Sequence, residues 1–263
     1  MNYLFTQFNK IEELLRNRFI LLLLDYDGTL TPIVETPQDA IISKETKELL
    51  QRLSKKSNYA LGIISGRSLE DIKNTVGVKD IIYAGNHGLE IEGPSIKFKS
   101  WVSLRIKSVI HRIADDMRKR LSKIKGVLIE DKELTLSIHY RLVGKKDMPV
   151  FEKIISEVTA SYTDKIKVDC GKKVYEIKPA VKWDKGRVVL WLLSRKQFSF
   201  DKKRILPIYL GDDTTDEEAF KALKRKGLTI FVGKSHTSGA DYYLRNTQEV
   251  VRFLHLISEI HHN

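Results

Sequence analysis

The sequence predicts an α/β fold with a parallel central sheet and an inserted α+β unit. Short apolar runs alternate with amphipathic stretches in the first and last thirds of the chain, which is typical of a parallel sheet with helical crossovers. Residues 21–24 are all leucine, as expected of a strand buried on both faces. Between these thirds the order changes to helix, two strands, helix, two strands.

The elements before the insert follow from apolar spacing and from turn residues. A helix at 43–55 begins at Ser43, a good N-cap, and places Leu49, Leu50 and Leu53 on one face. Gly93 and Pro94 separate two short runs and predict a hairpin. In order, the predicted elements are strand 20–24, helix 43–55, strand 59–64, helix 68–76, strand 80–84 and hairpin strands 89–91 and 96–98.

The insert and the resumed core are read in the same way. The insert is predicted to contain helix 102–121, strands 127–129 and 134–140, helix 149–160, and strands 166–168 and 173–177. The core resumes with helix 186–194, strand 206–210, helix 215–224, strand 228–232 and helix 248–260. We therefore expect an α/β core formed by residues 1–101 and 180–263, with the insert at 102–179 as a separate domain.

Composition excludes several classes of protein. No run of eighteen apolar residues occurs, so no membrane span is expected, and residues 1–18 lack the features of a signal peptide. Cys170 is the only cysteine, which excludes an internal disulfide and favours a cytoplasmic location. The net charge of +12 favours anionic partners, but long basic tracts are absent, so no nucleic acid partner is expected. Residues 102–177 hold 17 Lys and Arg against 11 Asp and Glu, or +6 of that charge, as in a basic lid over an anionic substrate.

Asp25 and Asp27 follow the all-leucine strand directly and precede Gly28. In an extended strand they would point the same way, and two like charges held together need a cation or a shared proton. The carboxyl ends of strands are also where open α/β sheets bind ligands. The pair therefore indicates a magnesium site or an acid–nucleophile couple. A plain turn is the alternative, because Asp and Gly both favour turns.

Two further strand ends carry polar residues. Ser65 and Gly66 follow strand 59–64, where a hydroxyl and a backbone N–H can hold a phosphoryl oxygen, and Arg67 can add a charged contact. A helix N-cap at Ser65 or Ser68 is the alternative. After strand 206–210 come Gly211 and the aspartates Asp212, Asp213 and Asp216, whose oxygens suit Mg²⁺. A capped polar loop is the alternative there.

Lys185 precedes the helix that restarts the core. A lysine in this place can neutralise clustered carboxylates and a transferring phosphoryl group, although a solvated lysine is the commoner case.

Taken together, the four segments resemble the motifs of the haloacid dehalogenase phosphatase superfamily, and in particular the trehalose-6-phosphate phosphatase family in its plant-type branch. The resembling segments lie between residues 25 and about 220, in both the core and the insert. They are Asp25–Leu30 with Pro32, Ile33 and Val34, then 63–68, Ala84-Gly85-Asn86-His87-Gly88, His139-Tyr140-Arg141, Glu176-Ile177-Lys178-Pro179, 182–186 and 211–220.

The resemblance implies a Rossmann-like core, a cap domain and a Mg²⁺-dependent phosphatase acting on a phosphorylated disaccharide. Asp25 would be the nucleophile, and Asp27 the acid and base. Asp25, Asp212, Asp213 and the main-chain carbonyl of Asp27 would hold the metal, with Asp216 as a further ligand or as a residue that orients the ligands. Ser65, Gly66 and Lys185 would hold phosphoryl oxygens. Arg141, Lys172 and Glu176 would face the sugar, with Asn86 and His87 near the junction of core and cap.

Several alternatives stay open at this stage. Another sugar-phosphate phosphatase, acting on sucrose phosphate or mannosyl-phosphoglycerate, would share the core motifs. A catalytically silent sugar-phosphate-binding regulator would lack Asp25 or Asp27, and both are present. We expect a monomer without a membrane partner.

Overall fold

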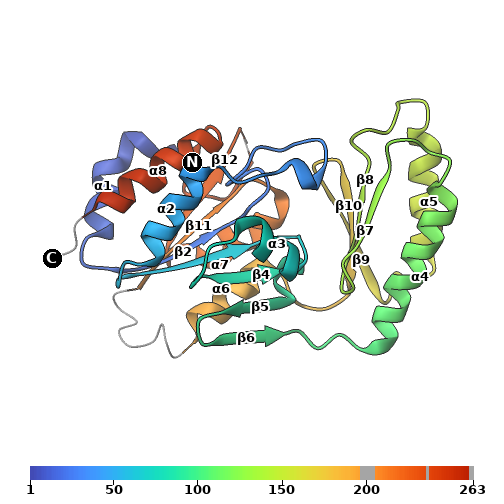
Figure 1. Cartoon of the computed structure of the whole chain (residues 1–263), viewed down its shortest axis with the longest axis horizontal. Coiled ribbons are helices and arrows are strands. Elements are labelled where there is room, and N and C mark those ends of the chain that lie inside the picture. The colour runs from blue at the N-terminus through green and yellow to red at the C-terminus, as the bar shows by residue number, and fades with distance from the viewer. Residues whose placement is uncertain (196–204, 235–236, 261–263) are drawn as a thin grey trace. The chain divides into compact units, whose positions relative to one another are not determined.

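The computed structural model describes residues 1–195, 205–234 and 237–260, and divides the chain into two compact units. The core unit comprises residues 1–99 and 183–263, and the insert unit comprises residues 100–182 (Figure 1). None of the helices in the described ranges is long and apolar enough to span a membrane.

The core unit contains a nine-stranded sheet of order β1-β13-β12-β11-β2-β3-β4-β5-β6, which confirms the predicted α/β class. In this spatial order, each pair of neighbouring strands between β1 and β4 is parallel. The last two pairs, β4-β5 and β5-β6, are antiparallel. The strands are β1 Asn2–Tyr3, β2 Phe19–Leu24, β3 Tyr59–Ile64, β4 Ile82–Gly85, β5 Glu90–Gly93, β6 Ile96–Lys99, β11 Ile205–Gly211, β12 Leu228–Val232 and β13 Tyr242–Leu244.

Helices cover both faces of this sheet, which explains the run of leucines in β2. Leu22 and Leu24 pack with α1, α2, α3 and α8, and Leu21 and Leu23 pack with α6 and α7 because successive side chains of a strand face opposite ways. Figure 1 shows α2 and α8 on one side of the strands and α6 on the other. These helices are α1 Phe8–Leu15, α2 Lys44–Ser54, α3 Leu69–Val76, α6 Lys185–Leu193, α7 Glu217–Leu223 and α8 Thr247–Glu259.

The first eighteen residues, whose place the sequence did not indicate, belong to the core. Strand β1 pairs in parallel with β13 at the sheet edge, and Ile11 and Leu15 of α1 are fully buried. Short 3-10 helices occur at Leu4–Gln7, Pro37–Asp39, Asn86–Gly88 and Thr214–Asp216. The sequence predicted neither β1 nor β13, because strands of two and three residues carry too little periodicity to be recognised.

The insert unit is an antiparallel four-stranded sheet of order β7-β8-β10-β9 packed on two helices. Apolar side chains of both helices and of the sheet form one buried cluster that includes Ile113, Phe151 and Ile177. The elements are α4 Leu104–Leu121, β7 Leu128–Asp131, β8 Leu136–His139, α5 Met148–Ala160, β9 Ile166–Gly171 and β10 Val174–Pro179.

Candidate active site

The polar segments predicted from the sequence meet at one edge of the core sheet. Asp25 follows β2, Ser65 follows β3, and Asp212 follows β11. These strands are parallel neighbours in the order β11-β2-β3, so their carboxyl ends lie side by side. Backbone hydrogen bonds continue just past the strands, from Asp25 N to Leu210 O at 2.9 Å and from Ser65 N to Ala84 O at 2.9 Å.

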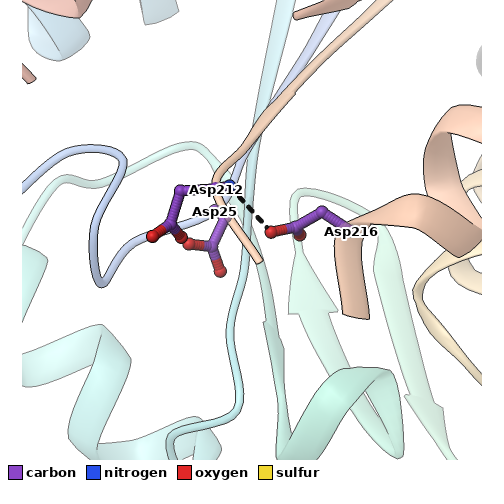
Figure 2. A group of neighbouring side chains, drawn as sticks. All are labelled: Asp25, Asp212 and Asp216. Atoms are coloured by element: carbon purple, nitrogen blue, oxygen red, sulfur yellow. Dashed lines mark hydrogen bonds between the residues drawn. The ribbon is translucent and has the colours of Figure 1, made fainter. Parts of the chain in front are cut away.

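Three buried carboxylates form a cluster at this edge. Asp25, Asp212 and Asp216 each offer an oxygen within 4.8 Å of the others, and Figure 2 shows the carboxylates of Asp25 and Asp212 next to one another. Gly28 (φ +92°) lets the loop after β2 approach Asp212, because a Cβ at this position would lie 2.0 Å from Asp212 Oδ2. Carboxylate oxygens in such a group suit a divalent cation.

Asp216 is the best-satisfied member of the cluster. Its Oδ2 accepts hydrogen bonds from the amides of Asp212 and Asp213, both at 3.0 Å, and Figure 2 shows the first of these bonds. Its Oδ1 accepts from Lys185 Nζ and Tyr209 Oη, both at 2.7 Å. Four donors occupy its two oxygens, so the Asp216 carboxylate holds the loop after β11 in place.

Lys185 lies between two of these carboxylates. It begins α6, whose N-cap is Asp184, and its Nζ donates to Asp25 Oδ1 and Asp216 Oδ1 at 2.7 Å each. Its side chain is 3% exposed. Three carboxylates and one ammonium sum formally to −2 in a buried space, which a divalent cation would neutralise.

The charges of this cluster perturb one another. Burial raises the pKa of Asp25 well above its ordinary value; Lys185 opposes this shift, and Asp216 and Asp212 add to it. Burial lowers the pKa of Lys185, but the negative charges of Asp216 and Asp25 outweigh it, so the pKa lies well above its ordinary value. Burial, with the charge of Asp216, likewise raises the pKa of Tyr209. Such mutual perturbation is typical of functional sites.

Asp27 does not point into the carboxylate cluster, in contrast to the alternation expected from the sequence. Strand β2 ends at Leu24, and the chain then turns, with Tyr26 O accepting bonds from the amides of residues 29, 30 and 31. Both carboxylate oxygens of Asp27 contact Arg67 instead, through Nε and Nη2 at 2.8 Å each. Alternation fails here because the strand ends at Leu24, three residues before Asp27.

The loop after β3 contains the other predicted phosphate-binding residues. Ser65 Oγ accepts a hydrogen bond from Arg67 N at 3.1 Å, which leaves the hydroxyl proton to donate. The Arg67 guanidinium also contacts Asp71 Oδ2 at 3.0 Å and Pro37 O at 2.6 Å. Burial lowers the pKa of Arg67, but its contacts with Asp27 and Asp71 outweigh burial, so the pKa lies above its ordinary value. All three of its nitrogens therefore have protein partners, and the predicted phosphate contact of Arg67 stays a prediction.

Asn86 and His87 lie against this loop. Asn86 N donates to Arg67 O at 2.6 Å and His87 N to Ser65 O at 2.9 Å. Both residues are buried and have left-handed backbones, with φ of 51° and 55°, a strained arrangement that is common near functional sites. A Cβ on Gly66 would lie 2.8 Å from the His87 ring, so only glycine fits there.

The predicted sugar-binding residues belong to the insert unit. Arg141 Nη2 donates to Lys172 O at 2.7 Å, so these two residues are brought together. Glu176 is paired in register with Ser137, and its Oε1 accepts from Ser137 Oγ at 2.7 Å. Lys132 Nζ lies 3.7 Å from the same oxygen.

Several residues that contact Asp216 or Glu176 were not predicted from the sequence. Ser137 could have been found, because cross-strand pairing of the two predicted strands places it opposite Glu176. No sequence signal indicated Tyr209 or Lys132, which reach their partners only in the folded chain. Asp213, predicted as a metal ligand, caps the 3-10 helix Thr214–Asp216 with its carboxylate, and its role as a ligand stays a prediction.

Comparison with known proteins finds a matching family model and similar proteins that are described as trehalose phosphatases. A family model described as trehalose-phosphatase matches residues 23–248. Trehalose-phosphate phosphatase B of Arabidopsis thaliana is 34% identical and aligns with 96% of this chain and 70% of the relative. Trehalose 6-phosphate phosphatase RA3 of Zea mays is 32% identical, with 94% and 72% covered.

Solved structures resemble the whole described fold. The C-terminal domain of a C. albicans trehalose-6-phosphate phosphatase superposes with a TM-score of 0.78 at 27% identity, covering 96% of this chain and 95% of that one. A haloacid dehalogenase-like hydrolase from Bacteroides thetaiotaomicron superposes with a TM-score of 0.65 at 19% identity, covering 91% and 100%. This second likeness concerns the fold alone.

Proposed function

Because the chain belongs to the trehalose-phosphatase family, we propose that it hydrolyses trehalose 6-phosphate to trehalose and phosphate with Mg²⁺ as cofactor. The observation that carries the proposal is the placement of Lys185 Nζ at 2.7 Å from both Asp25 and Asp216, beside Asp212. Three segments distant in sequence would thus supply a nucleophile, a cation and carboxylate ligands at the carboxyl edge of one parallel sheet.

Asp25 is the proposed nucleophile. Its carboxylate oxygen attacks phosphorus, a bond forms between them, and the bond from phosphorus to the sugar oxygen breaks. The resulting aspartyl-phosphate divides one difficult step into two easier ones. Lys185 fixes the Asp25 carboxylate through Oδ1 and compensates negative charge as two anions approach.

Asp27 is the proposed acid and base. It donates a proton to the departing sugar oxygen, and then accepts one from the water that attacks the aspartyl-phosphate. Water addition releases phosphate and regenerates the Asp25 carboxylate. The side chain of Asp27 is 39% exposed, against 8% for Asp25, which suits exchange of protons with substrate and solvent.

The chemistry of the donor set fits a divalent cation. Asp25 and Asp212 would hold it with the main-chain carbonyl of Asp27, and Asp213 is a further proposed ligand. Asp216 orients these ligands through its four hydrogen bonds. When bound, Mg²⁺ would offset the charge repulsion between a carboxylate and a phosphate monoester.

Phosphoryl oxygens are held by the loop after β3 and by Lys185. Ser65 has a hydroxyl proton to donate because its oxygen accepts from Arg67 N, and the Gly66 N–H adds a second donor. These donors and Lys185 stabilise the charge that develops on the transferring group.

We assign sugar recognition to the insert. Glu176 is the proposed acceptor of a sugar hydroxyl, with Arg141 and Lys172 as donors, and Asn86 and His87 of the core are proposed to contact the substrate. The net charge of +6 in residues 102–177 supports an anionic substrate. We further propose a cytoplasmic monomer.

A phosphate-release panel tests the proposal. Purified protein with Mg²⁺ would be given trehalose 6-phosphate, sucrose 6-phosphate, mannosyl-3-phosphoglycerate and glucose 6-phosphate. We expect trehalose 6-phosphate to have the highest kcat/KM and Asp25→Asn to abolish turnover while retaining substrate binding. Preference for another ester would overturn the substrate, and undiminished turnover by Asp25→Asn would overturn the nucleophile.

A further inference from the structure

The contact between Arg67 and Asp27 joins two parts of the proposed site. Arg67 belongs to the loop after β3, which contains the proposed phosphate donors Ser65 and Gly66 and is called the phosphate-holding loop below, and Asp27 is the proposed acid and base. Nε of Arg67 donates to Asp27 Oδ2 and Nη2 donates to Oδ1, both at 2.8 Å. This is the two-point geometry in which a guanidinium fixes both the position and the plane of a carboxylate. The two residues lie forty positions apart, so the contact is made only in the folded chain.

Arg67 is itself held firmly. Its side chain is 8% exposed, and its remaining contacts are Asp71, Pro37 O and the ring of Tyr26, 5.1 Å from the guanidinium carbon. Its backbone is tied to the phosphate-holding loop, because Arg67 N donates to Ser65 Oγ and Arg67 O accepts from Asn86 N. One residue therefore fixes phosphate donors through its backbone and Asp27 through its side chain.

Asp27 has few other constraints on its carboxylate. It lies beyond the end of β2, next to Gly28 with its φ of +92°, and its side chain is 39% exposed. Without Arg67, this side chain would be free to rotate. Proton transfer requires the donor oxygen within hydrogen-bond reach of the reacting atom, and small misplacements lower rates strongly.

We propose that Arg67 is the positioning residue of the acid–base step, holding the Asp27 carboxylate in one orientation and at a place set by the phosphate-holding loop. This role rests on the proposed function and differs from the phosphate contact predicted from the sequence. Arg67 takes no part in bond making; it acts through Asp27.

A double-mutant cycle on two substrates tests this role. Trehalose 6-phosphate has an alkoxide leaving group that needs a proton, whereas 4-nitrophenyl phosphate releases a stable phenolate that does not. We expect Arg67→Lys to lower kcat/KM for trehalose 6-phosphate by roughly 10- to 100-fold, a part of what general acid catalysis supplies. The value for 4-nitrophenyl phosphate should fall less than about threefold, since its departure needs no acid.

The same substitution should have no further effect in an Asp27→Asn background, because residues that act through one contact are not additive. Asp71→Asn is the matched control. It removes the negative charge of an outer partner of Arg67 but keeps the two bonds to Asp27, so kcat/KM should stay within about twofold of wild type. Thermal unfolding verifies that each variant is folded.

Equal losses on both substrates, or a loss by Arg67→Lys that persists in the Asp27→Asn background, would overturn the role. If Arg67→Lys does not fold, Asp27→Glu moves the carboxylate while keeping its charge and should show the same substrate selectivity; an unselective loss would overturn it equally. Wild-type protein that prefers another alkyl monoester would contradict only the proposed substrate, and the cycle would be run with that ester.

Discussion

The phenol hydroxyl of Tyr209 donates a 2.7 Å hydrogen bond to Oδ1 of Asp216, and both side chains are fully buried. The same oxygen accepts from Lys185. Lys185 donates to both Asp216 and Asp25. By fixing the Asp216 carboxylate, Tyr209 therefore helps to hold Lys185 in place. Because Asp212 directly follows β11, this one strand positions both Asp212 and the tyrosine that fixes Asp216.

Tyr209→Phe should lower kcat several-fold with little change in KM, since it removes one of the four donors that hold Asp216 and keeps the packing of the ring. The free energy of unfolding should fall by about 1.5–3 kcal/mol, the range for a buried hydrogen bond to a charged group. Steady-state kinetics and urea unfolding measure both effects. Tyr59→Phe is the matched control: it removes a buried bond to Ile257 O and should lower stability without changing kcat. Equal kcat losses in the two variants would contradict the prediction.

Asp216→Asn should have a larger effect. Asparagine replaces one acceptor oxygen by an NH₂ donor. At least one of the four groups that donate to Asp216, which are Lys185, Tyr209 and two backbone amides, would then lie against another donor and lose its hydrogen bond. We expect stability to fall by about 3–5 kcal/mol, as when one partner of a buried ion pair is removed. Urea unfolding gives this value. Glu218→Gln, an exposed change on the neighbouring helix, is the control, and a similar loss in both variants would argue against the network.

Removal of divalent cations should abolish turnover and lower stability together. Excess Mg²⁺ should raise the Tm of the wild type, because a ligand that binds only the folded chain stabilises it by mass action. The Tm shift should be absent in Asp212→Asn and nearly unchanged in Glu218→Gln. Differential scanning fluorimetry with and without EDTA measures this shift independently of activity. A full Tm shift in Asp212→Asn would place the metal elsewhere.

Glu176→Gln tests sugar recognition by the insert. An amide is a weaker acceptor for a sugar hydroxyl, so kcat/KM for trehalose 6-phosphate should fall by roughly 10- to 100-fold, the equivalent of a hydrogen bond to a charged group. The value for 4-nitrophenyl phosphate, which carries no sugar, should stay nearly constant. Because Glu176 also contacts Ser137 and Lys132, unfolding is measured in parallel. A loss on both substrates would indicate a structural role only.

The sequence was sufficient for much of the fold because its signals are local. Leu21 to Leu24 predicted a strand covered on both faces, and helices do cover both. Asp25, Ser65 and Asp212 could be predicted to meet because parallel strand ends lie at one edge. The direction of the Asp27 side chain could not, since it depends on a turn and on Arg67, forty residues away. Tyr209 resembles any apolar strand residue until Asp216 is placed beside it.

Alkaline pH should weaken the fold through Tyr83, a residue remote from catalysis in the proposed mechanism. Its hydroxyl donates to Val78 O at 2.7 Å and accepts from Val78 N at 3.1 Å, and burial raises its pKa to about 12. The phenol of an unfolded chain titrates near 10. Between about pH 10 and 12 the unfolded chain has lost a proton that the folded chain keeps, so the free energy of unfolding falls as pH rises. Below about pH 10 both states are protonated, and the contribution is constant.

Tyr83→Phe should therefore reduce the pH dependence as well as the stability. At pH 8 we expect it to be about 1–3 kcal/mol less stable than wild type, because the buried Val78 N–H loses its acceptor. Above pH 10 this difference should shrink, since only the wild type carries the titrating phenol at this position. Urea unfolding at several pH values between 8 and 12 measures the difference. Stability curves that run parallel over this range would show that Tyr83 ionises alike in both states, and that burial does not raise its pKa in the folded chain.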